Sequence, residues 1–316
     1  MLTTQNASRI IYPQIPDPIT KKVLQSLFTP TYDEKRWATT TVRSVAYQVA
    51  LLTQLKLFQI LGRFIPFPHI PPPVVEHIVT CLGRPDAGAL HYSKNTFYRH
   101  QVAVRHKLGV APWGPQARQL AESTVASIAE SRTDPAELIN AAVNALIKEH
   151  FELPAVDTLR RIAGTAHRSV NNAQWRRIYE SLSREQIQAL DALLDVEEER
   201  ESAFATLCRG AGKATRENLK ILLSHYEWLQ QLPDPAGPLA SIADTKVLQW
   251  ANEGKRLKAA ELREYVAPRR VALLLSTIRV ARGLVLDDMT NMLLKFARRI
   301  EWKSVQRLEG PMGTIV

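Results

Sequence analysis

The sequence predicts a mostly α-helical protein made of tandem helical modules. Long stretches rich in Ala, Leu, Arg, Gln and Glu recur along the 316 residues, and these residue types favour helices. The alternation of apolar and polar residues that is typical of half-buried strands is scarce. Apolar residues make up 45% of the chain, enough to build cores, and the length fits two or three compact modules.

Capping residues, prolines and glycines set the expected helix ends in a first module, residues 1–115. The expected elements are a helix over 33–65 capped by Asp33, a proline-rich corner over 64–73, a helix over 74–82 opened by Pro72 or Pro73, and a helix from Ser93 or Asn95 to Leu108 closed by Gly109. The segment Pro112-Trp113-Gly114-Pro115 then interrupts the pattern and marks the first module boundary.

The same signals divide the rest of the chain into a second module, 116–196, and a third, 197–316. Helices of the second module are expected over 116–129, from Pro135 after the capping Asp134, over 153–163, over 169–182, and from Ser183 to about Leu194. Those of the third module are expected over 215–229, 239–252, 258–265, 269–282 and 287–307.

The chain carries a net charge of +10 and has a pI near 9.7. The positive charge is concentrated in three blocks, +7 over 33–118, +4 over 155–184 and +6 over 263–307. A negatively charged partner is therefore expected, and nucleic acid comes first among the candidates. Several basic blocks with acidic or neutral spacers suit helical modules that each touch a polyanion.

The first candidate site is the helix that begins near Ser93. Cations for phosphate groups and short hydrogen-bonding side chains meet at its start, where a recognition helix contacts base edges and backbone N–H groups contact phosphate. Its candidate residues are Lys94, Asn95, Thr96, Tyr98, Arg99, His100 and Arg105. The alternative is a solvated basic helix with Phe97, Val104 and Leu108 facing a core.

The second candidate site covers residues 153–181, where helix, four-residue turn over 164–167 and helix give the spacing of a helix-turn-helix unit. Asn and Gln can read adenine, and Arg can read guanine or hold phosphate. The candidate DNA-binding residues are Arg160, Arg161, Arg168, Ser169, Asn171, Asn172, Gln174, Arg176 and Arg177. The alternative is an ordinary helical hairpin with one polar face.

The third basic stretch, 263–307, leaves two interpretations open. Arg269, Arg270, Arg279 and Arg282 flank the apolar run 271–275, and Arg298-Arg299 flank another apolar segment. This pattern fits an amphipathic helical pair that packs on a partner, and it fits nucleic-acid contact equally well.

No enzyme motif, cofactor site or metal site is expected from the sequence. The pair Gly212-Lys213 lacks the earlier glycine and the following Ser or Thr of a phosphate loop. His100 and His106 are six residues apart and would point to different faces of a helix, and Cys81 and Cys208 show no metal-ligand spacing. No run reaches the ~18 uncharged apolar residues of a membrane span. A reducing cytoplasm is the expected setting.

Several short segments occur in a characteristic order along the chain, at 55–64, 70–71, 74–78, 81–83, 98–100, 108–110, 134–140, 151–154 and 158–159. Together these segments resemble the N-terminal region of Tn-three family transposases, the enzymes of class II replicative transposons. The resemblance extends from about Ile11 to Arg307, whereas residues 310–316 do not continue the family pattern.

The resemblance implies helical DNA-binding modules that grip the terminal inverted repeats of a transposon. It also implies that the catalytic part, an RNase H-like domain with an Asp-Asp-Glu metal triad, lies further along a longer polypeptide. We therefore expect the chain to bind double-stranded DNA at transposon ends without catalysis, at the nucleoid of a bacterial cytoplasm. Pairing with other transposase chains is expected as a further interaction. The alternative is a truncated transposase that inhibits a full-length copy, or an inactive remnant.

Overall fold

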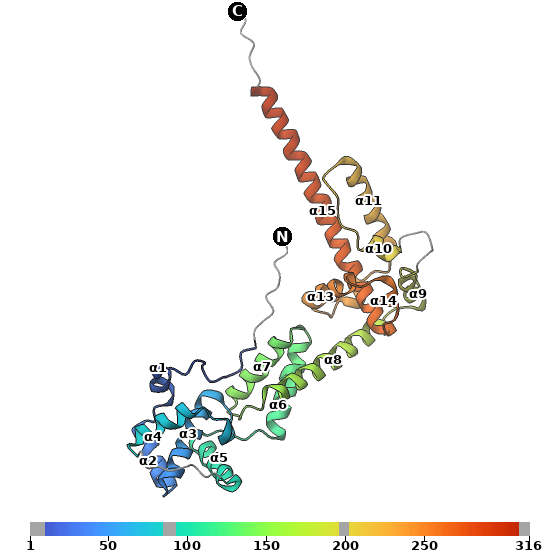
Figure 1. Ribbon diagram of the computed structural model, residues 1–316. Coiled ribbons are helices and arrows are strands. Elements are labelled where there is room, and N and C mark those ends of the chain that lie inside the picture. The colour runs from blue at the N-terminus through green and yellow to red at the C-terminus, as the bar shows by residue number, and fades with distance from the viewer. Residues whose placement is uncertain (1–9, 85–92, 196–201, 310–316) are drawn as a thin grey trace, which may run out of the picture. The chain divides into compact units, whose positions relative to one another are not determined.

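The computed structural model describes residues 10–84, 93–195 and 202–309, and within these ranges it contains helices but no strand (Figure 1). The prediction of a mostly α-helical fold is confirmed. Contacts divide the chain into two compact units, residues 1–167 and 168–316. The boundaries expected near residues 115 and 196 stay a prediction, and the segment 310–316 that departs from the family pattern lies outside the described residues.

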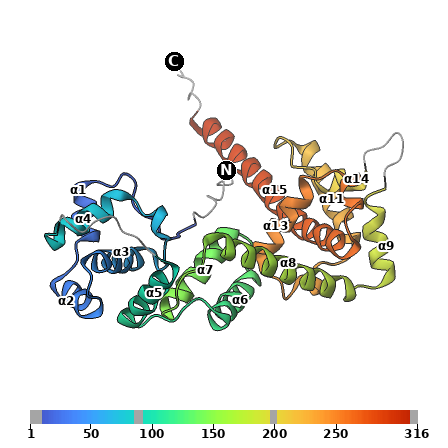
Figure 2. The same ribbon diagram turned by 60° about the horizontal axis from the view of Figure 1, so that its bottom comes forward.

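The first unit is built around α3 (Val45–Leu61), which is buried on nearly every side from Val49 to Phe58. The surrounding elements are α1 (Lys21–Val23), the π-helical turn η1 (Leu24–Phe28), α2 (Tyr32–Thr41), the 3₁₀ turn η2 (Phe67–His69), α4 (Pro72–Leu82) and α5 (Lys94–Leu108). Figure 2 shows α2, α4 and α5 near α3, and all three contact it, as does η1.

The helices α6 (Pro115–Ala129) and α7 (Pro135–Lys148) form a closely packed pair in the same unit. α6 buries Ala117, Ala121, Val125 and Ala129, one residue every four positions. Small side chains at this spacing line one side of the helix and let the partner backbone approach closely. Phe151 N then donates to Leu146 O, and Leu153 N donates to Gly62 O at 2.8 Å, so the segment after α7 returns to the end of α3.

Several helix ends follow the predicted signals. Ser93 accepts a hydrogen bond from Thr96 N at the start of α5, and Gly109 ends that helix in the left-handed conformation, φ +63°. Asp134 caps α7 with Pro135 in its first turn. Pro72 begins α4, as expected. Local capping chemistry therefore suffices to place these ends.

The helix predicted over 33–65 is wrong in one respect, because the structure breaks it into α2 and α3 at residues 42–44. Thr31, rather than Asp33, caps α2 and forms a capping box with Glu34. The hydroxyls of the three consecutive threonines 39–41 bond back to carbonyls of the preceding turn, and Val42 is extended. Such back-bonding weakens a helix, and β-branched Val42 favours extended backbone.

The helix-turn-helix predicted over 153–181 is also wrong: residues 164–167 are helical, and one helix, α8 (Val156–Glu180), runs through them. A lone glycine inside a helix costs only about 1 kcal/mol. Burial at helical spacing continues past Gly164, at Leu159, Ala163, Asn171, Gln174 and Ile178. Gly283 is likewise accommodated within α15 (Ala267–Glu309), where two helices were expected.

The second unit surrounds the first half of α15. Residues 271–278 of this helix are completely buried. α9, α10, α11, α12 and α13 all contact α15. The shorter helices are α9 (Arg184–Ala192), α10 (Ala203–Leu207), α11 (Arg216–Gln231), α12 (Ala236–Leu239), α13 (Asp244–Lys255) and α14 (Ala259–Arg263). A helix apolar on all sides needs such a shell, since it has no face suited to water.

Gly62 and Gly83 provide a matched test of the link between α3 and residue 153. Both have a left-handed φ, but a Cβ on Gly62 would lie 3.0 Å from Leu153 Cδ1, whereas a Cβ on Gly83 would meet nothing within 4 Å. We expect Gly83→Ala to lower the free energy of unfolding by about 1 kcal/mol through backbone strain, and Gly62→Ala to lower it by about 1–3 kcal/mol more through overpacking. Urea unfolding followed by circular dichroism measures both, and equal losses would contradict the close packing at Gly62.

Candidate nucleic-acid interface

The helix α5 separates a buried face from an exposed one. Phe97, His100, Val104 and Leu108 face the core around α3. Asn95, Arg99, Val102 and His106 are exposed. At about 100° per residue these four side chains fall within about 60° of arc, on the side opposite the core. α5 therefore presents one narrow polar and cationic stripe, with Lys94 and Tyr98 exposed beside it.

Two of the side chains on α5 that are predicted to bind DNA make contacts within the first unit instead. His100 is only 3% exposed and packs edge-on against Tyr47, with the ring centroids 6.1 Å apart. Arg105 forms an ion pair with Glu152 at 2.9 Å and lies over the ring of Phe64. A side chain must reach the surface to contact a base, so the DNA contact expected of His100 does not fit its burial. Half-buried Thr96 lies beside Ser93, with their hydroxyls 2.9 Å apart.

The helix α8 also has buried and exposed sides, but its exposed residues cover a broader arc than those of α5. The buried side chains are those of Leu159, Ile162, Ala163, Asn171, Gln174 and Ile178. The exposed side chains include Arg160, Arg161, Arg168, Ser169, Asn172, Arg176 and Arg177. Arg160 pairs with Asp157 on the preceding turn at 2.7 Å. For Arg161, Arg176 and Arg177 we find no ion pair within the described ranges, so their charge is not neutralised there.

Asn171 and Gln174 were expected to read adenine, and their positions argue against this role. They are 5% and 3% exposed, on the inward side of α8. Lys246 Nζ on α13, itself fully buried, donates to Gln174 Oε1 at 2.5 Å and lies 5.5 Å from the ring centroid of Trp250. Buried polar side chains need hydrogen-bond partners, so this cluster fixes the second half of α8 within the second unit.

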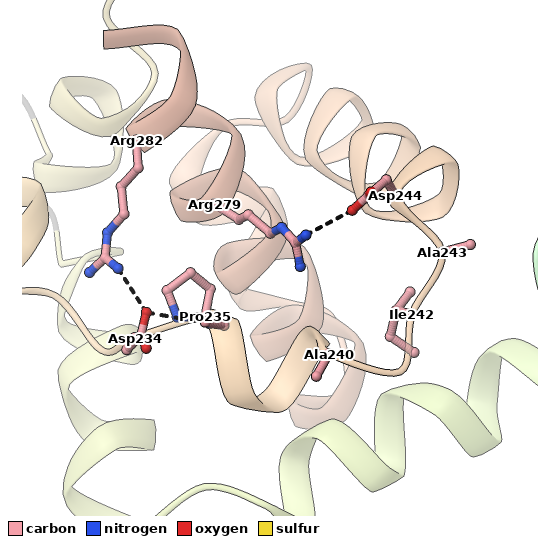
Figure 3. A pocket seen from close by; sticks show the side chains of 9 residues that line it. Asp234, Pro235, Ala240, Ile242, Ala243, Asp244, Arg279 and Arg282 are labelled. Atoms are coloured by element: carbon pink, nitrogen blue, oxygen red, sulfur yellow. Dashed lines mark hydrogen bonds and ion pairs between the residues drawn. The ribbon is translucent and has the colours of Figure 1, made fainter. Parts of the chain in front are cut away.

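The arginines of the third basic stretch are mostly paired with carboxylates of other helices. Arg269 pairs with Glu253 at 2.5 Å and Arg270 with Asp191 at 2.8 Å. Figure 3 shows a pocket of about 600 Å³ in which Arg279 pairs with Asp244 and Arg282 with Asp234, at 2.7 and 2.9 Å. With its two cations matched by two carboxylates, this pocket offers little net charge to a phosphate group.

The end of α15 keeps its cations exposed beside large apolar side chains. Lys295, Arg298 and Arg299 are exposed, and so are Leu293, Leu294, Ile300 and Trp302. Both interpretations of this stretch, protein contact and nucleic-acid contact, therefore stay open for its C-terminal half.

The described residues contain no group of three or more His, Cys, Asp or Glu side chains that could hold a metal ion. Burial raises the pKa of the Cys208 thiol, which opposes formation of a reactive thiolate. Among the helices described, none is both long and apolar enough to cross a membrane. The exposed cations on α5, on α8 and at the end of α15 are the features of the described residues that suit a large anionic partner.

The chain is similar to one family of domains and to several transposases. A family model described as a domain of unknown function (DUF4158) matches residues 1–166. The chain belongs to this family. It also resembles the transposase for transposon Tn3926 of Escherichia coli, 23% identical over 256 residues, and the transposase for transposon Tn501 of Pseudomonas aeruginosa, 23% identical over 231 residues. A third relative, the transposase for transposon Tn2501 of Escherichia coli, is 26% identical over 150 residues.

The resemblance to the N-terminal region of a Tn-three family transposase is confirmed. These alignments cover 79%, 71% and 48% of this chain but only 26%, 23% and 15% of the respective transposases. The DUF4158 match ends at residue 166, one residue before the first compact unit ends at residue 167. The family model therefore corresponds to one structural unit, which contains α5.

The buried histidine of α5 predicts a pH-dependent stability. Burial lowers the pKa of His100 to about 4, below its usual 6.5, so between pH 6.5 and 4 the unfolded chain binds a proton that the folded chain does not. We expect the free energy of unfolding to fall as pH drops through this window, and His100→Gln to flatten the slope by up to ~1.4 kcal/mol per pH unit. Urea unfolding between pH 4.5 and 7.5 measures the slope. His106→Gln, at an exposed position, is the control, and an unchanged slope in His100→Gln would contradict the burial.

Proposed function

We propose that this chain binds double-stranded DNA at transposon ends, as the DNA-binding N-terminal region of a transposase in the bacterial cytoplasm, at the nucleoid. The observation that carries the proposal is the exposure of cations on α5 and α8, among which Arg99, Arg161, Arg176 and Arg177 have no carboxylate partner within the described ranges. The relationship to transposases supports DNA, rather than another polyanion, as the partner.

The stripe on α5 suits the major groove. That groove is about 12 Å wide and admits one α-helix. Asn95 and Arg99 lie on the outward line of the helix and can pair with adenine and guanine, respectively. Lys94, at the side of the stripe, can reach phosphate, and the free N–H groups of the capped helix start favour an anion. Tyr98, 65% exposed, adds a hydroxyl donor beside them.

The stripe on α8 suits the phosphate backbone. Arg161, Arg168 and Arg176 are exposed at intervals of seven and eight residues, about two turns each, and Arg177 is exposed further round the helix. Each cation that neutralises a phosphate releases condensed counterions, which favours binding without reading the sequence. Asn172 and Ser169 are the exposed uncharged side chains that accompany these arginines and can donate to phosphate oxygens.

The proposal assigns no chemical step to this chain. Strand cleavage and joining need carboxylates that hold metal ions, and the described residues bring no such group together. The proposed role of the chain is to bind the transposon end and to fix its position along the duplex.

Protein pairing is the second candidate function, and the exposed end of α15 favours it. Leu293 and Ile300, two turns apart on one side of the helix, are 53% and 66% exposed, and Trp302 is 59% exposed on the other side. Large exposed apolar side chains close together on one helix favour contact with a partner. A transposase chain is the proposed partner of this surface. Inhibition of a full-length transposase that survives loss of DNA binding would identify this role, whereas inhibition that disappears with DNA binding would reject it.

The salt dependence of binding tests the proposed function directly. If the stripes contact six or more phosphates, affinity for duplex transposon ends should fall by ~10³ or more between 50 and 200 mM salt. Fluorescence anisotropy with a labelled terminal inverted repeat and a scrambled duplex measures the slope and the specificity. A flat salt profile, or equal affinity for both duplexes, would reject sequence-specific DNA binding.

The arginines of α8 should contribute to this slope individually. Arg176→Ala and Arg177→Ala should each reduce the slope of log affinity against log salt by about 1 and weaken binding similarly for matched and scrambled duplexes. The control is Arg279→Ala, whose guanidinium is paired with Asp244 and should leave the slope unchanged (Figure 3). The same anisotropy titrations measure all three variants. Equal effects of Arg176→Ala and Arg279→Ala would show that exposure does not select the DNA contacts.

A further inference from the structure

Val102 is the apolar member of the outward stripe on α5. It is 47% exposed, whereas its helix neighbour Val104 is completely buried. The core of the first unit is completed by Phe97, Val104 and Leu108 on the other side of the helix, so Val102 has no packing role there. An exposed single valine is ordinary on a protein surface. Val102, however, lies among side chains that can contact base edges, so it is itself placed to contact a base.

The spacing along the stripe matches the spacing of base pairs. Asn95 and Val102 are two turns apart, which is about 10.5 Å along the helix axis at 1.5 Å per residue. Base pairs are about 3.4 Å apart along the DNA axis. A helix that follows the groove therefore places Val102 about three base pairs from the base that Asn95 faces. Arg99 lies between them, and His106 lies one turn beyond.

A single base edge in the major groove presents an apolar group, namely the 5-methyl group of thymine. Hydrogen-bonding side chains gain nothing from this methyl group, but an apolar side chain removes it from water. The two methyl groups of Val102 can supply such a contact. Its stiff side chain loses little conformational freedom on binding, because the branched Cβ already restricts χ1 in a helix.

We propose that Val102 packs against the 5-methyl group of a thymine, and that α5 thereby selects an A·T pair about three base pairs from its Asn95 contact. This inference rests on the DNA-binding function proposed above for α5. It assigns to Val102 a specificity-determining role that charge cannot supply, since phosphate contacts are blind to the base.

Replacement of thymine by uracil tests this role, because it removes the methyl group and leaves the hydrogen-bonding edges intact. Duplexes enriched by the full chain from a random-sequence pool are copied with either thymidine or deoxyuridine nucleotides. The wild-type chain should bind uracil DNA about fourfold more weakly, the effect of losing roughly one buried methyl group. Val102→Ser should bind both duplexes equally, with the affinity that the wild type has for uracil DNA.

The control is Val266→Ser, since Val266 is 69% exposed and lies outside α5. This variant should keep the fourfold preference for thymine, and helicity measured by circular dichroism should be the same in all three proteins. Sequence-specific binding with no difference between thymine and uracil, or a preference that persists in Val102→Ser, would overturn the role of Val102 and leave the proposed function intact. Failure of the chain to enrich any sequence would overturn both.

Discussion

The helices α5 and α8 each bury one side, and this burial decides which of their cations remain in water. Phe97 and Val104 fix the rotation of α5, so Asn95 and Arg99 turn outward. Ile178 is part of the core that fixes the second half of α8, and Arg176 and Arg177 are exposed. A helix has only one rotation that buries such a face, so the same packing that stabilises the fold also orients the proposed DNA contacts.

Equal charge in the sequence therefore has unequal consequences in the structure. Residues 271–278 of α15 are buried on all sides, so the arginines that flank this segment are partly removed from water and need partners. Arg270, for example, forms a bidentate contact with Asp191, and Arg282 also donates to the carbonyls of Leu229 and Leu232. Removing a charge from water is costly unless it is paired. The net charge of the stretch 263–307 thus overstates what this segment offers to a polyanion.

Local signals predicted much of the fold and of α5, but not the arrangement of α8. Ser93 caps the start of α5 and Gly109 ends it, and each signal can be recognised from the residues next to it in the sequence. In contrast, the inward line of α8 contains Gln174, whose partner Lys246 lies 72 residues away, so its burial has no local signature. Because polar residues usually face water, the sequence predicts that Asn171 and Gln174 lie on the DNA face, whereas the structure buries both. The same holds for His100.

The continuity of α8 also changes what this helix can recognise. A helix that began near Ser169 would offer unpaired backbone N–H groups and a positive dipole end to DNA. In the continuous helix those N–H groups lie inside the helix, where they bond to carbonyls of the preceding turn, so only side chains remain available. With Asn171 and Gln174 buried, the exposed contacts of α8 are mainly cationic. If the chain binds DNA as proposed, α5 is then the helix that discriminates between DNA sequences. It keeps both a capped start and an outward stripe of side chains that can contact base edges. α5 lies inside residues 1–166, the segment that the family model covers.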